Sequence, residues 1–413
     1  MTALYENKEE QEQVILVAAS VSDEVSVQAS LDELEELVKT AGAATVGRFV
    51  QNRQTIDTAT YIGSGKVEEL RELVMTYQAT GIVCDDELTP SQMNNLEREL
   101  NIKIMDRTMV ILDIFAARAS TREGQLQVEL AQLRYRSTHL IGMGRILSRQ
   151  GGGIGTRGPG EKKLETDRRI IRERISKLKA ELERVKINRS TQRKRRVEKG
   201  IPVICIVGYT NAGKSTLLNK LTDSEVLSED KLFATLDPTT RSLELPDGQQ
   251  VLLTDTVGFI RKLPHHLIQA FRATLEEAKY SDYILHVVDA SNSQMDIQMH
   301  TVYETLRELG VEGKPILTAF NKVDKEGVPG ILKDFKADEM YRISARTGQG
   351  LEEMLTGIGR RIRESRIYLE HLYSYQEAAK IALVRKNGQI IEEAYQEDGI
   401  LIRAFVDRRG NYV

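Results

Sequence analysis

The chain has 413 residues, of which 40% are hydrophobic and 29% are charged, and its net charge is −3. This length leaves room for about two to four domains, and the composition excludes a disordered chain and a disulfide-stapled miniprotein. The two cysteines, Cys84 and Cys205, each lie in an apolar, strand-like run, so they indicate neither a disulfide framework nor a zinc site.

The small net charge hides a strong polarity along the chain. Residues 1–40 carry ten acidic and two basic side chains, whereas residues 141–200 carry nineteen basic and seven acidic ones, a net of +12. Such a local excess is typical of a protein that binds a polyanion, although a solvated helix face can also be basic. Nucleic acid is therefore a candidate partner.

The first residues, MTALYENKEEQEQ, are polar and acidic, and they lack the basic and apolar regions of a secretory signal. No run along the chain approaches the roughly eighteen apolar residues that a membrane-spanning helix needs. We therefore expect a cytoplasmic, monomeric protein without membrane insertion, for which peripheral association with a membrane stays open.

Residues 1–120 are the first predicted domain. Between residues 13 and 118, strand-like runs such as QVILVAA and TGIVCDD alternate with helix-like runs such as SLDELEELVKTAG and KVEELRELVMTYQAT, which predicts a small α/β domain. The run Gly63–Lys66 imitates a phosphate-binding loop. Because Thr60 replaces the first glycine of that motif and Val67 replaces its hydroxyl, we interpret the run as a tight turn between a strand and a helix.

Residues 121–200 form a second predicted unit, a helical hairpin followed by a basic linker. Leucines with helical spacing precede a glycine-rich stretch, and apolar residues spaced four, three, four and three follow it: Ile171, Ile175, Leu178, Leu182 and Val185. Two such segments joined by a short turn predict an antiparallel hairpin whose tip lies near residues 147–160. A flexible connector that touches nothing is the alternative, since linkers are often glycine-rich.

The segment Gly208–Ser215, GYTNAGKS, follows the apolar run PVICIVG and precedes the helical run STLLNKLT. It fits G-x-x-x-x-G-K-[ST] in the context that a phosphate-binding loop (P-loop) requires. Its glycines let backbone N–H groups surround a phosphate, Lys214 reaches the outer phosphate oxygens, and the Ser215 hydroxyl holds Mg²⁺.

Three later segments complete a guanine-nucleotide site. The strand VLLTD ends at Asp255, which is suited to an indirect contact with Mg²⁺, and Gly258 can bring its N–H to a γ-phosphate. The Asp324 carboxylate in FNKVD can accept from two N–H groups of guanine, a pairing that adenine does not offer. The run Ser344–Arg346 places a loop N–H where it can meet the guanine O6.

In this order the motifs resemble those of translation-factor-related GTPases over residues 200–365. The resemblance implies that FATLDPTTR is switch I and that Thr235 is the second hydroxyl ligand of Mg²⁺, with Thr239 and Thr240 as rivals. The predicted catalytic residues are Lys214, Thr235 and Gly258, and the predicted metal ligands are Ser215 and Thr235. The predicted nucleotide contacts are Gly208, Tyr209, Thr210, Asn211, Ala212, Gly213, Lys214, Ser215, Phe233, Ala234, Thr235, Leu236, Asp237, Asp255, Thr256, Val257, Gly258, Asn321, Lys322, Val323, Asp324, Ser344, Ala345 and Arg346.

Nearly the whole chain resembles the HflX family of ribosome-associated GTPases, through FATLDPTTR, DTVGFI, the helical hairpin and GGGIGTRGPGE. The resemblance implies that the glycine-rich tip enters the peptidyl-transferase region of the large (50S) ribosomal subunit and contacts its rRNA. Binding would then split stalled or idle ribosomes, and GTP hydrolysis would drive release. The predicted ribosome contacts are Arg149, Gly151, Gly152, Gly153, Ile154, Gly155, Thr156 and Arg157.

The expected fold class is α/β. A P-loop GTPase domain with a mostly parallel sheet, residues 201–365, follows the α/β domain with its helical hairpin and precedes a small α+β unit at residues 366–413. The expected cofactor is Mg²⁺, with GTP as substrate. Asn211 resembles a loop residue that binds K⁺ in some related GTPases, so K⁺ is a further candidate.

Position 259 departs from the better-known GTPases. Ras-like sequences place a water-orienting Gln after D-x-x-G, whereas this chain has Phe259, which cannot hydrogen-bond the attacking water. We therefore expect slow GTP turnover by the protein alone and stimulation by a partner. A purely structural role of Phe259 in the core is compatible with the same sequence.

Two other functions stay open at this point. A GTPase that assists RNA modification or ribosome assembly would need a second reactive site, and the sequence shows no reactive cysteine, His cluster or dinucleotide fingerprint. A coiled-coil scaffold that uses GTP only to set its shape would fit Phe259, although a full set of nucleotide motifs argues against permanent inactivity.

The guanine assignment of Asp324 is directly testable. Replacing Asp324 by Asn should relax the choice of base by at least about tenfold, because the variant loses the carboxylate that accepts from two guanine N–H groups. Competition between GDP and other purine nucleoside diphosphates measures this choice. An unchanged preference for guanine would contradict the assignment.

Overall fold

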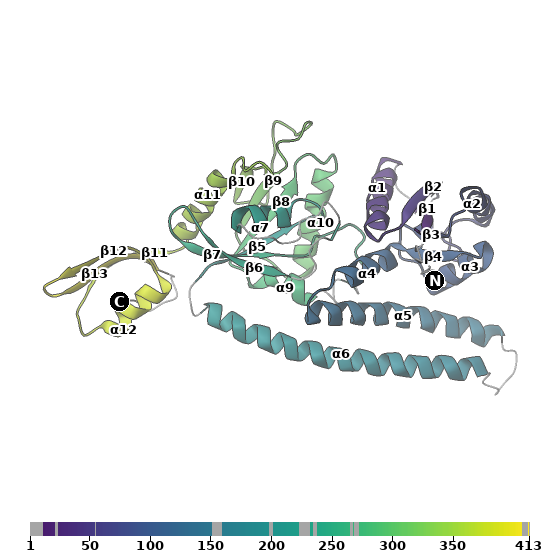
Figure 1. The fold of residues 1–413 in the computed structure, drawn as a ribbon, viewed down its shortest axis with the longest axis horizontal. Helices are drawn as coiled ribbons and strands as arrows, with labels where there is room; N and C mark the ends of the chain where they lie inside the picture. Colours follow the sequence, from purple (N-terminus) through teal and green to yellow (C-terminus); the bar gives the residue numbers. More distant parts are fainter. Residues whose placement is uncertain are drawn as a thin grey trace, which may run out of the picture. The chain divides into compact units, whose positions relative to one another are not determined.

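The computed structural model describes residues 11–20, 24–53, 55–150, 159–197, 201–222, 232–233, 238–264, 267, 272–406 and 412. The chain divides into two compact units (Figure 1). The first comprises the described parts of Met1–Leu182, Lys231–Phe233 and Lys262–Phe271. The second comprises the described parts of Glu183–Asp230, Ala234–Arg261 and Arg272–Val413.

A parallel sheet with the strand order β2-β1-β3-β4 forms the centre of the first unit (Figure 1). Its elements are β1 (Gln13–Ser20), α1 (Glu24–Thr40), β2 (Ala44–Asn52), α2 (Ser64–Tyr77), β3 (Gly81–Cys84), α3 (Pro90–Leu100), β4 (Lys103–Asp106) and α4 (Arg107–Arg118). Strands β1 and β3 are buried apolar runs, because helices cover a parallel sheet on both faces. The predicted α/β alternation is confirmed.

The connection from β2 to α2 differs from the tight turn that the sequence suggested. It extends from Arg53 to Gly63 and is held by Asp57, whose carboxylate accepts from the N–H groups of Ala59 at 2.8 Å and Thr60 at 3.1 Å. The prediction was wrong because these local hydrogen bonds satisfy the backbone of a longer loop. Lys66, in the first turn of α2, forms an ion pair with a carboxylate of the same helix.

The helical hairpin consists of α5 (Arg122–Gln150) and α6 (Pro159–Val197) (Figure 1). Arg174 forms a two-pronged ion pair with Glu129, with N–O distances of 2.6 and 2.8 Å, and Arg122 pairs with Glu181 at 3.0 Å, so the helices are antiparallel. Between them lies an apolar seam of Leu126, Leu130, Leu133, Ile175, Leu178 and Leu182. The seam contains three of the five positions that the heptad spacing named.

The second unit is built on a sheet with the strand order β10-β9-β8-β5-β7-β6, in which β6 is antiparallel to β7 and the other pairs are parallel. Its elements are β5 (Val203–Gly208), α7 (Lys214–Thr222), β6 (Thr239–Glu244), β7 (Gln250–Asp255), α9 (Arg272–Tyr280), β8 (Tyr283–Asp289), α10 (Met295–Glu308), β9 (Ile316–Asn321), β10 (Glu339–Arg342) and α11 (Leu351–Glu364). The parallel strands β5, β7, β8 and β9 carry buried apolar side chains, and β7, β8 and β9 end in the polar residues Asp255, Asp289 and Asn321 at one edge. That edge is where ligands bind in open α/β sheets.

A small α+β segment follows, as the sequence predicted. It contains β11 (Ile367–Tyr373), α12 (Ala378–Asn387), β12 (Gln389–Gln396) and β13 (Gly399–Val406). The strands are antiparallel in the order β11-β13-β12, and one sheet face packs with α12 around the buried Tyr373 and Val384. The domain boundaries at residues 120, 200 and 365 stay predictions; they fall between elements of the fold.

Over the described part of the chain, no helix combines the length and apolar character needed to cross a bilayer.

Candidate nucleotide-binding site

The P-loop connects the end of β5 to the start of α7 and makes close backbone contacts. A Cβ atom on Gly208 would lie 2.2 Å from the carbonyl oxygen of Val287, so a side chain cannot be accommodated there. Asn211 and Gly213 have left-handed φ angles of 59° and 93°. Such a succession of turned residues directs N–H groups toward one point, as anion binding requires.

Lys214, the first residue of α7, is buried, and its Nζ donates to the carbonyl oxygen of Tyr209 at 2.7 Å. Burial lowers the pKa of this ammonium group to about 8; Asp255 opposes the change and Lys322 adds to it. A bound phosphate would place a negative charge beside the Lys214 ammonium group. Nucleotide binding would therefore raise the pKa of this group back toward its ordinary value.

Ser215 and Asp255 lie together, as a magnesium site requires. The Ser215 Oγ donates to the Asp255 Oδ2 at 2.8 Å, and Asp255 is fully buried at the end of β7. A hydroxyl whose proton points to a buried carboxylate presents its lone pairs outward, which suits an oxygen ligand of Mg²⁺. These two residues fit the ion in the predicted roles.

The second hydroxyl ligand is not decided by the described residues, because Thr235 lies outside them. Of its two rivals, Thr239 begins β6 and stands opposite Asp255 in the strand register. The Thr240 hydroxyl lies 3.0 Å from that of Thr254, within the sheet. Of the two rivals, Thr239 therefore lies nearer to Asp255 in the sheet. The assignment of Thr235 as the second ligand stays a prediction.

The segment after β7 is fastened to the P-loop through the backbone of Phe259. Its N–H donates to the Gly208 oxygen at 3.1 Å, and its oxygen accepts from the Thr210 N–H at 2.7 Å. A Cβ on Gly258 would come within 2.8 Å of the Thr210 Cα and 3.0 Å of the Lys214 Nζ. Only glycine lets the chain pass this close to the Lys214 ammonium group.

The Phe259 ring is 2% exposed, so it belongs to the core. The structural role that the sequence left open is therefore present, and the ring offers no hydrogen bond to a water molecule. Val257 and Thr256 are also buried, and the Thr256 hydroxyl donates to the Ile206 oxygen at 2.7 Å.

Asn321, at the end of β9, joins the two ends of the site. Its Nδ2 donates to the Ala212 oxygen at 2.8 Å, and its Oδ1 accepts from the Ala345 N–H at 2.8 Å. The Lys322 Nζ donates to the Asn211 oxygen at 2.8 Å and to Asp289 at 2.7 Å. The P-loop and the Ser344–Arg346 loop are thereby held in fixed register.

Asp324 is exposed at this edge, and a hydrogen bond from Ser344 is the main cause that lowers the pKa of its carboxyl group. Ser344 and Ala345 are buried, whereas Arg346 is exposed. The carboxylate therefore stays ionised and accessible, as an acceptor for a base would need to be. Val323 lies behind it, and its N–H donates to the Ile343 oxygen at 3.2 Å.

Sequence reasoning missed two residues of this site, Asp289 and Arg261. Asp289 ends β8 and binds Lys322, and its position after the apolar run YILHVV was a usable signal. The Tyr209 hydroxyl accepts from the Arg261 N–H at 2.9 Å, and no sequence pattern indicates this contact.

Several predicted residues are placed elsewhere or lie outside the described residues. The Phe233 ring is buried in the first unit, where it packs edge-on against Phe115 with ring centroids 4.7 Å apart, so a nucleotide contact would have to use its backbone. Arg149 belongs to α5, but its side chain is not described. Outside the described residues lie Ala234, Thr235, Leu236, Asp237, Gly151, Gly152, Gly153, Ile154, Gly155, Thr156 and Arg157.

Three family models match successive parts of the chain. Residues 28–116 match "GTP-binding GTPase N-terminal", residues 118–196 match "GTP-binding GTPase Middle Region", and residues 203–322 match "50S ribosome-binding GTPase".

Curated relatives cover nearly the full length. A protein named GTPase HflX from Lacrimispora saccharolytica is 63% identical over 406 residues, which cover 98% of this chain and 96% of the relative. GTPase HflX from Escherichia coli K12 is 41% identical over 360 residues, covering 85% and 83%. A solved GTP-binding protein from Sulfolobus solfataricus in complex with GDP is 26% identical, with a TM-score of 0.44 over 85% of this chain and 98% of that chain.

The close packing at Gly213 predicts a loss of nucleotide affinity in Gly213→Ala. The new Cβ would lie 2.3 Å from the Asn321 Nδ2 and would displace the amide that joins the two ends of the site. We expect GDP affinity, measured by calorimetry, to fall by about tenfold or more.

Gly42→Ala is the matched control. Gly42 has a φ of 97°, close to the 93° of Gly213, but no atom lies within 4 Å of its added Cβ. Equal losses of GDP affinity in both variants would mean that backbone strain, and not Asn321, explains the effect.

The lowered pKa of Lys214 predicts how nucleotide affinity depends on pH. A bound phosphate raises this pKa again, so binding takes up a proton when the free group is neutral, and affinity falls as pH rises through about 8. Below that pH the affinity should be flat. Calorimetry of GDP binding at about pH 7 and about pH 8.5, in buffers of different ionisation enthalpy, measures the uptake. Lys214→Arg, which stays charged, should show none; equal uptake in both proteins would contradict the assignment.

Proposed function

This chain belongs to the HflX family of GTPases, and from that premise we propose that it binds the large (50S) ribosomal subunit and splits stalled or idle ribosomes, with hydrolysis of GTP driving its release. GTP hydrolysis itself follows from the family and from the GTPase domain. The proposal of a ribosomal partner is supported by the match of residues 203–322 to "50S ribosome-binding GTPase". We place this activity in the cytoplasm and expect the protein to act as a monomer.

We propose the following roles for the residues of the site. The P-loop backbone and Lys214 hold the phosphates, and the Gly258 N–H contacts the γ-phosphate. Asp324 selects guanine, and Asn321 keeps the phosphate and guanine ends of the site aligned. Ser215 would bind Mg²⁺ directly and Asp255 would orient it, with Thr235 as the second hydroxyl; when bound, the ion neutralises charge on the phosphates. Asn211, whose oxygen accepts from Lys322, stays the candidate residue for K⁺.

The buried Phe259 supports slow turnover by the protein alone. Its ring lies in the core and has no group that could hydrogen-bond the attacking water, and two backbone hydrogen bonds fasten the residue to the P-loop. Another group has to orient that water. We propose that docking on the 50S subunit supplies or positions this group, which makes hydrolysis conditional on ribosome binding.

The hairpin would deliver the contact to rRNA. Residues 141–200 have a net charge of +12, which suits phosphate neutralisation, and the glycine-rich stretch at residues 151–160 has little side-chain bulk. The ion pairs and leucine seam between α5 and α6 make the hairpin a defined element up to Leu182. That supports a contacting tip over a slack connector.

Steady-state GTP turnover tests the proposal. At fixed salt, 50S subunits should stimulate turnover by at least about tenfold, whereas 30S subunits and free tRNA should not. No stimulation by 50S subunits would overturn the ribosomal trigger and would favour the scaffold alternative.

A second variant locates the contact. Replacing Gly151, Gly152 and Gly153 by bulky residues should leave GTP affinity unchanged and weaken binding to 50S subunits, measured by co-sedimentation. If the variant binds 50S subunits as the natural protein does, the glycine-rich tip is not the contact.

A further inference from the structure

The first residue of the predicted switch I, and the residues that follow the segment Asp255–Arg261 (hereafter switch II), belong to the N-terminal unit. The compact first unit includes the residue pair Leu232 and Phe233 and the segment that begins at Lys262. The chain therefore passes from one unit to the other between Arg261 and Lys262, four residues after Gly258. On the GTPase side of this crossing, the Arg261 N–H donates to the Tyr209 hydroxyl of the P-loop at 2.9 Å.

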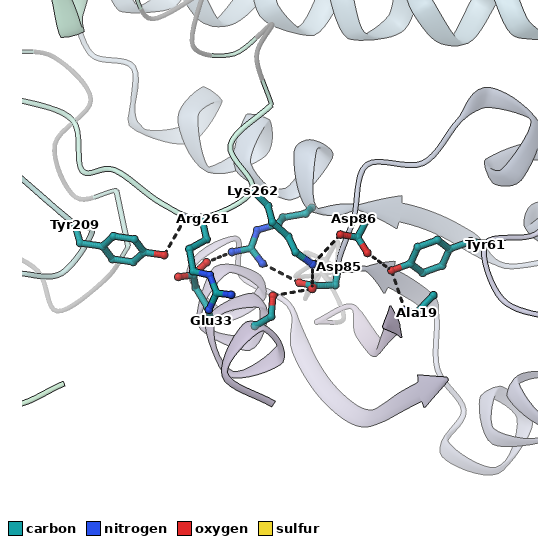
Figure 2. A network of polar contacts seen from close by, with 10 residues as sticks. Ala19, Glu33, Tyr61, Asp85, Asp86, Tyr209, Arg261 and Lys262 are labelled. Carbon is teal, nitrogen blue, oxygen red and sulfur yellow. Dashed lines mark hydrogen bonds and ion pairs between the residues drawn. The ribbon is translucent and has the colours of Figure 1, made fainter. Parts of the chain in front are cut away.

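On the other side, the ammonium group of Lys262 lies between the carboxylates of Asp85 and Asp86 (Figure 2). It forms an ion pair with the Asp85 Oδ2 and another with the Asp86 Oδ1 at 2.7 Å. Both acids directly follow β3, at the carboxyl edge of the N-terminal sheet. The Asp85 side chain is 3% exposed and that of Lys262 is 37% exposed, so the pair is only partly accessible to water.

The two carboxylates are held in place by the N-terminal domain itself. Asp85 accepts from the Ser30 hydroxyl at 2.7 Å and from Arg107 at 2.8 Å. Asp86 accepts at 2.6 Å from the Tyr61 hydroxyl, which in turn accepts from the Ala19 N–H at 3.1 Å (Figure 2). Both carboxylates therefore have partners other than Lys262 that hold them in position, and such preorganised charge pairs fix geometry better than flexible surface pairs do.

Without Lys262, the carboxylates of this cluster would outnumber the cations that pair with them. The buried Arg107 pairs with both Asp85 and Glu33, so one cation already serves two carboxylates. Lys262 is the cation that the structure places on Asp86. A carboxylate close to the interior is costly without a cation, which gives this contact a free energy that a fully exposed pair would lack.

The backbone of Lys262 has a φ of 53°, in the left-handed region. A lysine seldom adopts this conformation, which costs some free energy, and such residues are frequent at switches and clamps. The contact therefore fixes the direction in which the chain leaves the segment Asp255–Arg261. Phe233, the first residue of the predicted switch I, is also left-handed and packs against Phe115 of α4.

We propose that Lys262 is a positioning residue for GTP hydrolysis: by binding Asp85 and Asp86 it anchors the end of switch II to the N-terminal domain and so holds Gly258 beside Lys214. The segment is then fixed at both ends, by the P-loop contacts of Phe259 and Arg261 and by the ion pairs of Lys262. The N-terminal domain thereby sets the rate of GTP turnover, and the γ-phosphate in turn affects the N-terminal anchor, since coupling between sites is reciprocal. This inference rests on the proposed contact of Gly258 with the γ-phosphate.

The test is a double-mutant cycle on the full chain, without ribosomes. Lys262→Gln should lower kcat for GTP about fivefold or more and leave GDP affinity and the thermal unfolding midpoint nearly unchanged. Asp86→Asn should do the same, and the double variant should be no worse than either single variant. Lys262→Arg should recover much of the lost rate, because it keeps the charge.

Lys103→Gln is the matched control. Lys103 pairs with Glu12 at 2.6 Å on the same N-terminal sheet, and the described residues give it no tie to the switch segments. Its kcat should equal that of the natural protein. The proposal is overturned if Lys262→Gln keeps the natural kcat, if the two single effects add as independent ones, or if the control loses as much. A normal cycle without 50S stimulation would refute the ribosomal function and leave the Lys262 anchor intact.

Discussion

The hydrogen bonds of a single amide side chain, Asn321, hold the two halves of the nucleotide site in register. The Nδ2 binds the P-loop at Ala212 and the Oδ1 binds the backbone at Ala345, both at 2.8 Å, from a position 2% exposed. Because Asn321 is buried, losing either bond would leave a polar group without a partner in the interior. The distance between the phosphate end and the guanine end of the site depends on this residue, and so does the placement of Lys322 and Asp324 that follow it.

The same construction is used in both units of the protein. Parallel strands with apolar residues on both faces end together at one edge, and the first polar residue of each strand end lies there: Asp255, Asp289 and Asn321 in the GTPase, and Asp85 and Asp106 in the N-terminal domain. Buried carboxylates at such an edge need cations or hydroxyl groups. In the GTPase these partners are Ser215 and Lys322, and around Asp85 they are Ser30, Arg107 and Lys262.

This construction explains how the switch segments can respond to more than the nucleotide. The chain between Gly258 and Lys262 has polar contacts at each end, so its position reflects both the P-loop and the N-terminal sheet. The proposed phosphate contact at Gly258 and the ion pairs of Lys262 would then act on one short segment, so each would support the other. Phe259, in the middle of that segment, has a buried phenyl side chain in place of the usual water-orienting group. Under the proposed function, a partner supplies or positions that group and so controls hydrolysis.

The sequence alone determined the elements whose signals are local. The order of apolar runs, the P-loop spacing, the Asp255–Gly258 and Asn321–Asp324 motifs and the heptad seam each follow from residues close together in the chain, and they predicted the fold class, the GTPase site and the hairpin. Tertiary structure decided what depends on distant segments: the amide bridge of Asn321, the Lys322–Asp289 pair, the burial of Phe259 and Phe233, and the Lys262 anchor on Asp85 and Asp86. Those partners lie 24 to 177 positions apart, and no local pattern specifies which of many lysines meets a given carboxylate.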